Sequence, residues 1–262
     1  MTIPKKSLGQ HWLEDEASLQ AMCDTATITP DDVVLEIGPG LGTLTEKLMA
    51  QAGQVIAVEF DADLARQLPK RLKKASNVTV VHQDILSFDL TRLPVNYKVI
   101  ANIPYYLTSN LIRVLSESTN PPLSATLLIQ KEVAERVAAG PGEMSLLSVT
   151  AQMYFEPSLS LVVPAALFTP PPKVNSQIVH LQRRSQPLYG DLDSKELFRL
   201  VKAGFSNRRK TLHNSLSAGL HITKDETRDL LQRAAINPQL RPQDLALSDW
   251  IQLQKIIVAA PA

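Results

Sequence analysis

Short apolar runs alternate with amphipathic stretches over the first 180 residues of the chain. The runs are rich in Val, Ile and Leu, which is typical of strands buried on both faces of a sheet. Between the first three runs, at 43–49 and 62–72, leucines recur at helical spacing. Strands that alternate with helices predict an α/β fold with a mostly parallel, doubly wound sheet. The predicted strands are 33–37, 54–58, 77–81, 98–101 and 124–129, with 160–163 and 176–181 as further candidates.

The pattern changes after Leu181. Residues 182–193 are polar and have no period, so we interpret them as a linker. Leu197, Leu200, Val201 and Phe205 then form one apolar stripe at helical spacing. Ser248 is predicted to cap a last helix that carries Trp250 and Ile256. The chain is therefore divided into a first domain at 1–183 and a small all-helical domain at 184–262.

Composition narrows the class of protein. The chain has 262 residues, of which 44% are hydrophobic and 20% charged, as in an ordinary globular protein. Its single cysteine, Cys23, excludes an intramolecular disulfide and a cysteine-rich zinc site. No apolar run approaches eighteen residues, and the N-terminus lacks the apolar segment of a signal peptide. We expect a cytoplasmic monomer with no membrane partner and no metal.

Charge is unevenly distributed along the chain. The net charge is only +1, but residues 181–262 hold 13 Lys and Arg against 8 Asp and Glu. An excess of this size is compatible with a solvated helical surface as well as with a surface that faces nucleic acid. Arg208, Arg209 and Lys210 carry more information, because three consecutive cations cannot all pair with the few acids nearby.

Glycines cluster between the first predicted strand and the helix that follows it. The segment 36–42, Glu-Ile-Gly-Pro-Gly-Leu-Gly, brings Gly38 and Gly40 close to any ligand at the strand end. A dinucleotide fingerprint would need glycine at Thr43, and a P-loop needs Gly-Lys-Ser/Thr. An acid followed by G-x-G-x-G indicates a ligand with less phosphate and a positive charge. S-adenosylmethionine fits, because it has an adenosine and a cationic sulfonium but no pyrophosphate.

Acidic residues follow the next two predicted strands. Glu59 ends the second strand, where a carboxylate can accept hydrogen bonds from both hydroxyls of a ribose. Asp84 follows the third strand and is placed to accept from an adenine amino group. Each acid alone could be an ordinary loop residue. Since ligands of open α/β sheets bind at the carboxyl ends of the strands, the coincidence favours cofactor binding.

The tetrapeptide Asn102-Ile103-Pro104-Tyr105 follows the fourth predicted strand. It could be a plain turn, but it also suits chemistry on an adenine amine, a poor nucleophile whose lone pair is delocalised. The side-chain oxygen of Asn102 and the carbonyl of Ile103 could accept its two N–H groups and direct the lone pair at a methyl group. Pro104 restricts Ile103 to an extended conformation, and Tyr105 can stack on the base. Positioning then dominates the methyl transfer, with no general base or metal required for its first step.

Six segments occur along the chain in a fixed order: 9–13 (GQHWL), 36–42 (EIGPGLG), 102–105 (NIPY), 130–133 (QKEV), 168–174 (FTPPPKV) and 208–211 (RRKT). Each segment is moderately specific, whereas their order along the chain is highly specific. In these segments the chain resembles the ribosomal RNA adenine dimethyltransferase family, and in particular its small-subunit members. The resemblance runs from Lys5 to about Trp250.

The resemblance implies a Rossmann-like methyltransferase domain followed by a small helical domain that contacts RNA. It implies S-adenosylmethionine-dependent dimethylation of two adjacent adenosines in the 3′-terminal hairpin loop of small-subunit rRNA, late in assembly of the immature small ribosomal subunit. It also implies that Phe168 helps to clamp the target base opposite Tyr105, although a core aromatic is the plainer interpretation of Phe168. The cofactor contacts that it implies are His11, Leu13, Gly38, Glu59, Asp84 and Asn102.

One departure from the family pattern falls in the first segment. Relatives usually carry Asn-Phe where this chain has His11-Trp12. A histidine can still donate or accept one hydrogen bond, so we keep His11 as a cofactor-contact candidate. Its protonation could add a pH dependence near neutrality.

Lys173, Arg208, Arg209 and Lys210 are the candidates for contacts with RNA phosphates. The target adenosine must be unstacked or lie in a loop for its amine to reach Asn102. One alternative is a large-subunit rRNA adenine dimethyltransferase, which resembles this chain in the glycine loop and in 102–105. The stretches 168–174 and 240–245 favour the small-subunit branch instead. DNA adenine and protein glutamine methyltransferases fit less well, because they usually carry Pro-Pro after the Asn.

A different class of protein is also compatible with the pattern, namely a non-catalytic factor that binds immature small subunits. The presence of Glu59, Asn102 and Tyr105 argues against it, because an idle factor has no need of these side chains.

Overall fold

The computed structural model describes residues 4–5, 8–73, 75–207 and 209–259. The chain forms two compact units. The first comprises residues 1–135 and 156–183, and the second comprises 136–155 and 184–262. No helix in the described part of the chain is both long and apolar enough to span a bilayer.

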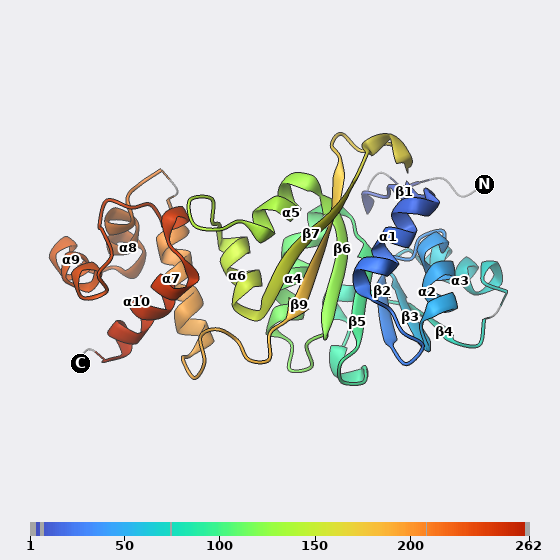
Figure 1. Cartoon of the computed structure of the whole chain (residues 1–262), viewed down its shortest axis with the longest axis horizontal. Helices are drawn as coiled ribbons and strands as arrows, with labels where there is room; N and C mark the ends of the chain where they lie inside the picture. The colour runs from blue at the N-terminus through green and yellow to red at the C-terminus, as the bar shows by residue number, and fades with distance from the viewer. Residues whose placement is uncertain (1–3, 6–7, 74, 208, 260–262) are drawn as a thin grey trace. The chain divides into compact units, whose positions relative to one another are not determined.

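A mostly parallel sheet is the framework of the first unit (Figure 1). Its seven strands lie in the order β4-β3-β2-β5-β6-β9-β7. The pairs β2–β3, β3–β4, β2–β5 and β5–β6 are parallel, whereas β9 runs antiparallel to β6. The strands span Val33–Ile37 (β2), Gln54–Glu59 (β3), Val78–His82 (β4), Lys98–Asn102 (β5), Ser124–Gln130 (β6), Phe155–Val163 (β7) and Ser176–Arg183 (β9). The sheet, its doubly wound order and all seven predicted strands are confirmed.

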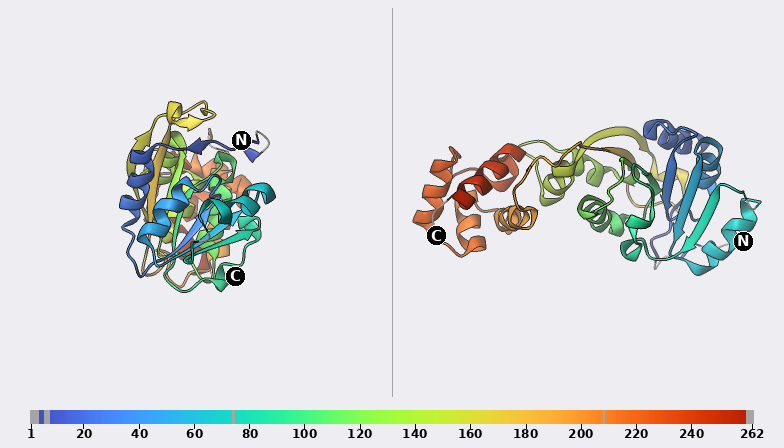
Figure 2. Two further views of the ribbon diagram at one scale, coloured as in Figure 1. Left: turned by 90° about the vertical axis from the view of Figure 1, so that its right-hand side faces the viewer. Right: turned by 90° about the horizontal axis from the view of Figure 1, so that it is seen from below.

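Helices cover both faces of this sheet (Figure 2). On one face lie α1 (Glu16–Ala26), α2 (Thr43–Gln51) and α3 (Ala62–Arg71), and on the other lies α4 (Thr108–Glu117). The helix α5 (Lys131–Ala138) follows β6, and η2 (Ile85–Ser87) and η3 (Leu90–Arg92) lie between β4 and β5. Alternating strand residues face α1, so that Met22 of α1 is fully buried in one cluster with Val34 and Ile100.

Aspartates cap two of these helices. Asp15 accepts from Ser18 N at 2.9 Å before α1, and Asp61 accepts from Asp63 N at 3.0 Å before α3.

A second, two-stranded sheet joins the start of the chain to a much later segment. β1 (Trp12–Leu13) pairs antiparallel with β8 (Phe168–Thr169), with Leu13 opposite Phe168. The short turns η4 (Tyr105–Leu107) and η5 (Ala165–Leu167) precede α4 and β8. This pairing could not be predicted from the sequence, because strands of two residues are too short to show a period.

The second unit is a bundle of helices with its own core. It contains α6 (Leu146–Tyr154), α7 (Ser194–Phe205), α8 (Leu212–Leu220), α9 (Lys224–Arg233) and α10 (Leu247–Ala259), with η6 (Pro242–Asp244) before α10. Trp250 is fully buried at its centre. A Cβ at Gly204 of α7 would lie only 2.4 Å from the Trp250 ring, so these helices approach closely because position 204 has no side chain.

The structure differs from the sequence expectations in two features of this bundle, namely the segments that belong to it and the residue that caps its last helix. The expected boundary after residue 183 coincides with a boundary of the units, but 136–155 group with the second unit because Met144, Val149 and Met153 share its core. The prediction that Ser248 caps the last helix is wrong. α10 begins at Leu247, and Asp249 accepts from the backbone N–H of Ala246 at 2.8 Å, so an acid within the first turn takes the capping role.

Candidate active site

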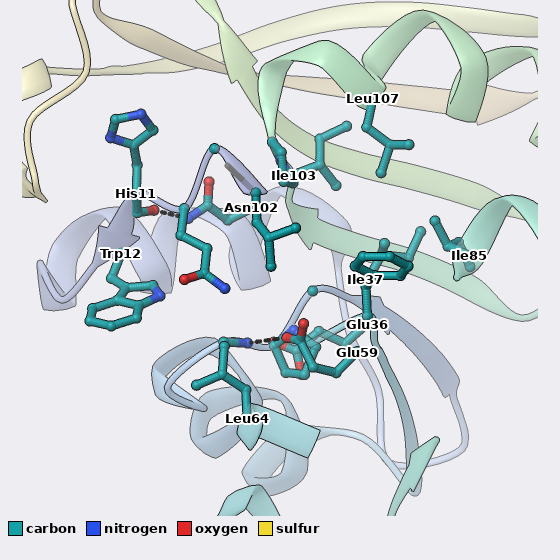
Figure 3. Close-up of a pocket in the computed structure, with 18 of the residues that line it drawn as sticks. His11, Trp12, Glu36, Ile37, Glu59, Leu64, Ile85, Asn102, Ile103 and Leu107 are labelled. Atoms are coloured by element: carbon teal, nitrogen blue, oxygen red, sulfur yellow. Dashed lines mark hydrogen bonds between the residues drawn. The ribbon is translucent and has the colours of Figure 1, made fainter. Parts of the chain in front are cut away.

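A cavity opens at the carboxyl edge of the parallel strands in the first unit (Figure 3). The crevice of a doubly wound sheet lies where the strand order reverses, which here is between β2 and β5. The loops after β2, β3, β4 and β5 all contribute to the cavity wall, and the β1–β8 pair adds the remaining side. The topology therefore brings the four loops and the β1–β8 pair, which are separate in the sequence, together around one space.

The glycine loop after β2 has backbone conformations that side chains rarely adopt. Gly38 has φ +67°, and a Cβ there would meet no atom within 4 Å, so its backbone is open to a ligand. Gly42 has φ +89° and caps α2, and a Cβ there would lie 2.6 Å from Leu68. The first glycine thus allows close approach of a ligand, and the last allows α2 and α3 to pack.

The carboxylate of Glu59 is fixed at the end of β3. Its Oε2 accepts from the backbone N–H of Gly40 at 3.0 Å, and its Oε1 accepts from the N–H of Asp61 at 2.8 Å. Burial raises the pKa of Glu59 and the charge of Asp61 adds to this, while the backbone donors lower it. A carboxylate has about four acceptor positions, so the backbone donors leave acceptor capacity on Glu59 for a ligand.

Glu36 is the most deeply buried acid of the site. Burial raises its pKa to about 8, and the nearby carboxylate of Glu59 adds to the shift, although the hydroxyl of Thr45 opposes it. Its Oε2 has no hydrogen-bond partner among the described residues. Glu36 is therefore mostly uncharged at neutral pH when no cation lies in the cavity.

The replacement Glu36→Gln should reduce the amount by which the free energy of unfolding falls as the pH rises. Below pH 4.5 the carboxyl is protonated in both the folded and the unfolded chain. Between pH 4.5 and about 8 the unfolded chain ionises while the folded one stays protonated, so the wild-type free energy of unfolding falls as pH rises. We expect that fall to shrink by at least about 1 kcal/mol in Glu36→Gln, measured by urea unfolding between pH 5 and 8. Exposed Glu46→Gln is the control, and an identical slope in both variants would contradict this assignment.

Asn102 lies at the tip of β5, beside the start of the chain (Figure 3). Its side-chain Nδ2 donates to the backbone carbonyl of His11, at 3.4 Å. This contact uses the amide nitrogen, so the amide oxygen keeps both lone pairs for a ligand. Ile103 is buried at 2% exposure and Pro104 begins the η4 turn, which fixes the backbone directly after Asn102.

Three rings surround the space next to Asn102. Tyr105 shares a hydrogen bond of 2.9 Å with the hydroxyl of Ser176, and burial raises its pKa, so the phenol remains protonated. His11 lies nearly parallel to Tyr105, with ring centroids 6.0 Å apart and planes 20° from each other. Nδ1 of His11 donates to the carbonyl of Pro170 at 2.7 Å, which links the residue before β1 to the residue after β8. Phe168 lines the same cavity but is buried at 3% exposure.

Comparison with known proteins identifies the family. A model of the family described as ribosomal RNA adenine dimethylase matches residues 2–258. The chain belongs to this family. The ribosomal RNA small subunit methyltransferase A of Dehalococcoides mccartyi is 39% identical over 260 residues, which cover 98% of this chain and 89% of that protein. The protein of the same name from Rippkaea orientalis is 39% identical over 272 residues, 98% of each chain.

Two solved structures resemble the chain over most of its length. A dimethyladenosine transferase from Plasmodium falciparum is 28% identical with a TM-score of 0.79, covering 93% of this chain and 96% of that one. The 23S rRNA methyltransferase ErmE is 28% identical with a TM-score of 0.74, covering 93% and 98%. The Rossmann-like methyltransferase fold is thus confirmed.

For this member of the dimethylase family, the structure brings together all the catalytic and cofactor candidates from the sequence. They line the one cavity described above: His11, Leu13, Gly38, Gly40, Glu59, Asp84, Asn102, Ile103, Tyr105 and Phe168. The RNA-contact candidates are not part of that lining. Lys173 is exposed between β8 and β9, Arg209 and Lys210 are exposed in the second unit, and Arg208 lies outside the described residues.

Several cavity residues were missed by the sequence analysis. Phe60 follows Glu59 and is 57% exposed, while Ile85 and Leu86 follow Asp84. The sequence does carry a signal for them, because all three come within two residues of an acid at a strand end, where a ligand is expected. In the sequence Trp12 stands out only as a departure from the family pattern, yet its indole lies against the glycine loop, 3.4 Å from the position of a Cβ at Gly40.

Proposed function

We propose that the protein transfers methyl groups from S-adenosylmethionine to N6 of two adjacent adenosines in the 3′-terminal hairpin loop of small-subunit rRNA. The product is N6,N6-dimethyladenosine, formed late in assembly of the small subunit in the cytoplasm by a monomeric enzyme. The observation that carries the proposal is the position of Asn102, whose free amide oxygen lies in the same cavity as Glu59 and Tyr105. Membership of the ribosomal RNA adenine dimethylase family supports the reaction class.

The cavity residues fit S-adenosylmethionine. The open backbone at Gly38 leaves room for the methionyl part, next to the candidates His11 and Leu13. Glu59 would accept from the ribose hydroxyls. Asp84 uses Oδ1 to cap η2 through the N–H of Leu86 at 2.9 Å, which leaves its other oxygen for the adenine amino group. When bound, the cofactor supplies a methyl group on a positively charged sulfur.

Apolar side chains complete this part of the cavity. Phe60, Ile85 and Leu86 lie next to the two acids, so a flat adenine ring can be held between apolar surfaces while the acids read its polar edge and the ribose. The combination of fixed acceptors and apolar walls is what an adenosine requires.

Asn102 would act on the target amine. Its Oδ1 and the carbonyl of Ile103 would accept the two N–H groups of adenine N6, which favours a pyramidal nitrogen and frees its lone pair. The contact between Asn102 Nδ2 and His11 O keeps the amide from turning over. Because the reaction is a displacement, the gain comes from holding the amine in line with the methyl group.

Tyr105 would support the target base. Its hydroxyl is held by Ser176, so the ring has a fixed plane against which a purine can stack. We propose Phe168 as a further side of this slot, since β1 and β8 pair to place it in the cavity. A base can enter only after it leaves its own stack, which is easiest in a loop.

The choice between ribosomal subunits can be tested directly. Labelled S-adenosylmethionine is offered to undermethylated small subunits, to large subunits and to naked small-subunit rRNA, and the labelled bases are mapped. We expect label on two adjacent adenosines of the small-subunit RNA. Label confined to the large subunit would favour the alternative and contradict the proposal. The curated relatives at 39% identity are named for the small subunit, which favours our proposal.

Arg209 and Lys210 are proposed to contact RNA phosphates. Both are exposed in the turn that precedes α8, where the N–H of Lys210 donates to Asn207 O at 3.0 Å. The double variant Arg209→Ala, Lys210→Ala should bind rRNA more weakly. It should also lower the steepness of log K against log salt by about 1 to 2, because each lost phosphate contact removes about 0.7 to 0.9.

Filter binding across a salt series measures this slope. Lys224→Ala with Arg228→Ala removes the same charge from α9 of the same unit and is the matched control. An unchanged slope in the Arg209 and Lys210 variant would remove both residues from the RNA contact surface.

A further inference from the structure

Tyr106 is an aromatic side chain at the cavity that the reaction described above does not use. It follows Tyr105 in the η4 turn and lines the same cavity, yet it is 67% exposed. Neighbouring residues of a 3₁₀ turn project in directions about 120° apart. Tyr105 is therefore directed into the protein, where it bonds Ser176, while Tyr106 is directed towards the solvent.

The Tyr106 ring is supported on one side. A Cβ placed at Gly9 would contact its Cε1 at 3.5 Å and its Cδ1 at 3.6 Å, and Pro104 at 3.6 Å, so Gly9 lies against both residues. The segment around Gly9 is held in turn, since Gln10 accepts from Lys5 N at 2.7 Å and donates to Asp61 at 3.3 Å. One side of the Tyr106 ring therefore packs against residue 9, while the rest of the ring is exposed to solvent.

We propose that Tyr106 is a second stacking site, which holds the base next to the adenosine that is being methylated. This inference rests on the proposed function. When the target base enters the cavity beside Tyr105, its neighbour in the RNA must remain just outside, within reach of the adjoining residue of the turn. Stacking on an exposed ring is how proteins hold unpaired bases, and it accepts any base because every base has a π-face.

The features of the site favour a base over an apolar partner. Tyr106 is an amphipathic ring beside the polar segment of Lys5 and Gln10, whose side chains both donate to Asp61. A tyrosine keeps its hydroxyl in water while its ring face is covered, which suits a base at a wet cavity mouth. The two adjacent adenosines of the proposed substrate would then occupy adjacent sites, one at Tyr105 and one at Tyr106.

The first test is steady-state kinetics on undermethylated small subunits. Tyr106→Leu should raise KM for the subunit about tenfold, which is about 1.4 kcal/mol and within the range for one stacked base. The kcat and the KM for S-adenosylmethionine should stay within twofold, and Tyr106→Phe, which keeps the ring, should recover the wild-type KM. Asn110→Ala, exposed on α4, is the surface control.

The second test locates the stacked base. A hairpin RNA carries the fluorescent base 2-aminopurine either at the target position or directly beside it. Stacking quenches its fluorescence, so Tyr106→Leu should relieve the quenching beside the target but not at the target. Tyr105→Leu should do the reverse.

Three results would overturn the inference. The first is an unchanged KM for the subunit in Tyr106→Leu. The second is a rise in the KM for S-adenosylmethionine in place of the rise for the subunit, which would mean that Tyr106 covers the cofactor. The third is a Tyr106→Phe variant that is as defective as Tyr106→Leu. Failure of the proposed function is a different result, because the wild-type protein would then label no adenosine in either subunit.

Discussion

Replacing Asn102 by alanine should lower kcat for adenine methylation by about a thousandfold or more, with little change in the binding of either substrate. In the proposed mechanism the amide oxygen would accept from the target amine and orient it, and loss of such positioning costs several kcal/mol of the barrier. Folding should be nearly unaffected, because the side chain makes one protein hydrogen bond, at 3.4 Å to His11 O. Single-turnover methylation of undermethylated small subunits measures the effect, with thermal unfolding as the check on structure.

Two further variants sharpen the test of Asn102. Asn102→Asp keeps an acceptor oxygen at the same position and should retain more activity than the alanine variant. Asn110→Ala removes an exposed amide from α4 and should behave as wild type. If Asn102→Ala kept more than about a tenth of the wild-type rate, the role of Asn102 in holding the amine would be refuted.

Replacing Glu59 by alanine should weaken S-adenosylmethionine binding about a hundredfold. Two charge-assisted hydrogen bonds to the ribose would be lost, at about 1.5 kcal/mol each, and tenfold in affinity corresponds to about 1.4 kcal/mol. The variant would also lose the hydrogen bond from the N–H of Gly40 to Glu59, which holds the glycine loop in its present position. Calorimetric titration of the cofactor measures the loss, and rRNA affinity should stay unchanged.

S-adenosylhomocysteine separates two explanations for the effect of Glu59. It has the same ribose but no charged sulfur, so Glu59→Ala should weaken both ligands by the same factor if the carboxylate binds the ribose. A loss confined to the cationic ligand would instead mean that Glu59 acts through charge. Asp63→Ala, an exposed acid four residues further along, is the control, and affinities within threefold of wild type in Glu59→Ala would contradict the ribose contact.

Much of the catalytic unit could be predicted from the sequence because its signals are local. A buried parallel strand is a continuous apolar run, so 33–37 and 124–129 were recognisable without knowledge of their neighbours. The carboxyl ends of parallel strands meet at one edge, so polar residues after successive runs had to converge. Glu59, Asp84 and Asn102 accordingly line one cavity.

What the sequence could not predict depends on contacts between distant segments. The pairing of Leu13 with Phe168 joins two strands of two residues each, and no local pattern announces it. The orientation of His11 is also a tertiary result, because only the folded chain places Pro170 O and the Tyr105 ring beside it.

The grouping of 136–155 with the second unit has the same origin. Its apolar residues could have packed against the sheet as well as in the helical bundle. Contact with Leu197 and Trp250 in one core, rather than any local feature, decides the matter.

The most direct test is a crystal structure with S-adenosylhomocysteine and a bound adenosine. We expect the cofactor ribose on Glu59, the purine against Tyr105, and its N6 within hydrogen-bond distance of both Asn102 Oδ1 and Ile103 O, facing the sulfur. A purine N6 turned away from Asn102, or a cofactor bound away from Glu59, would contradict the account.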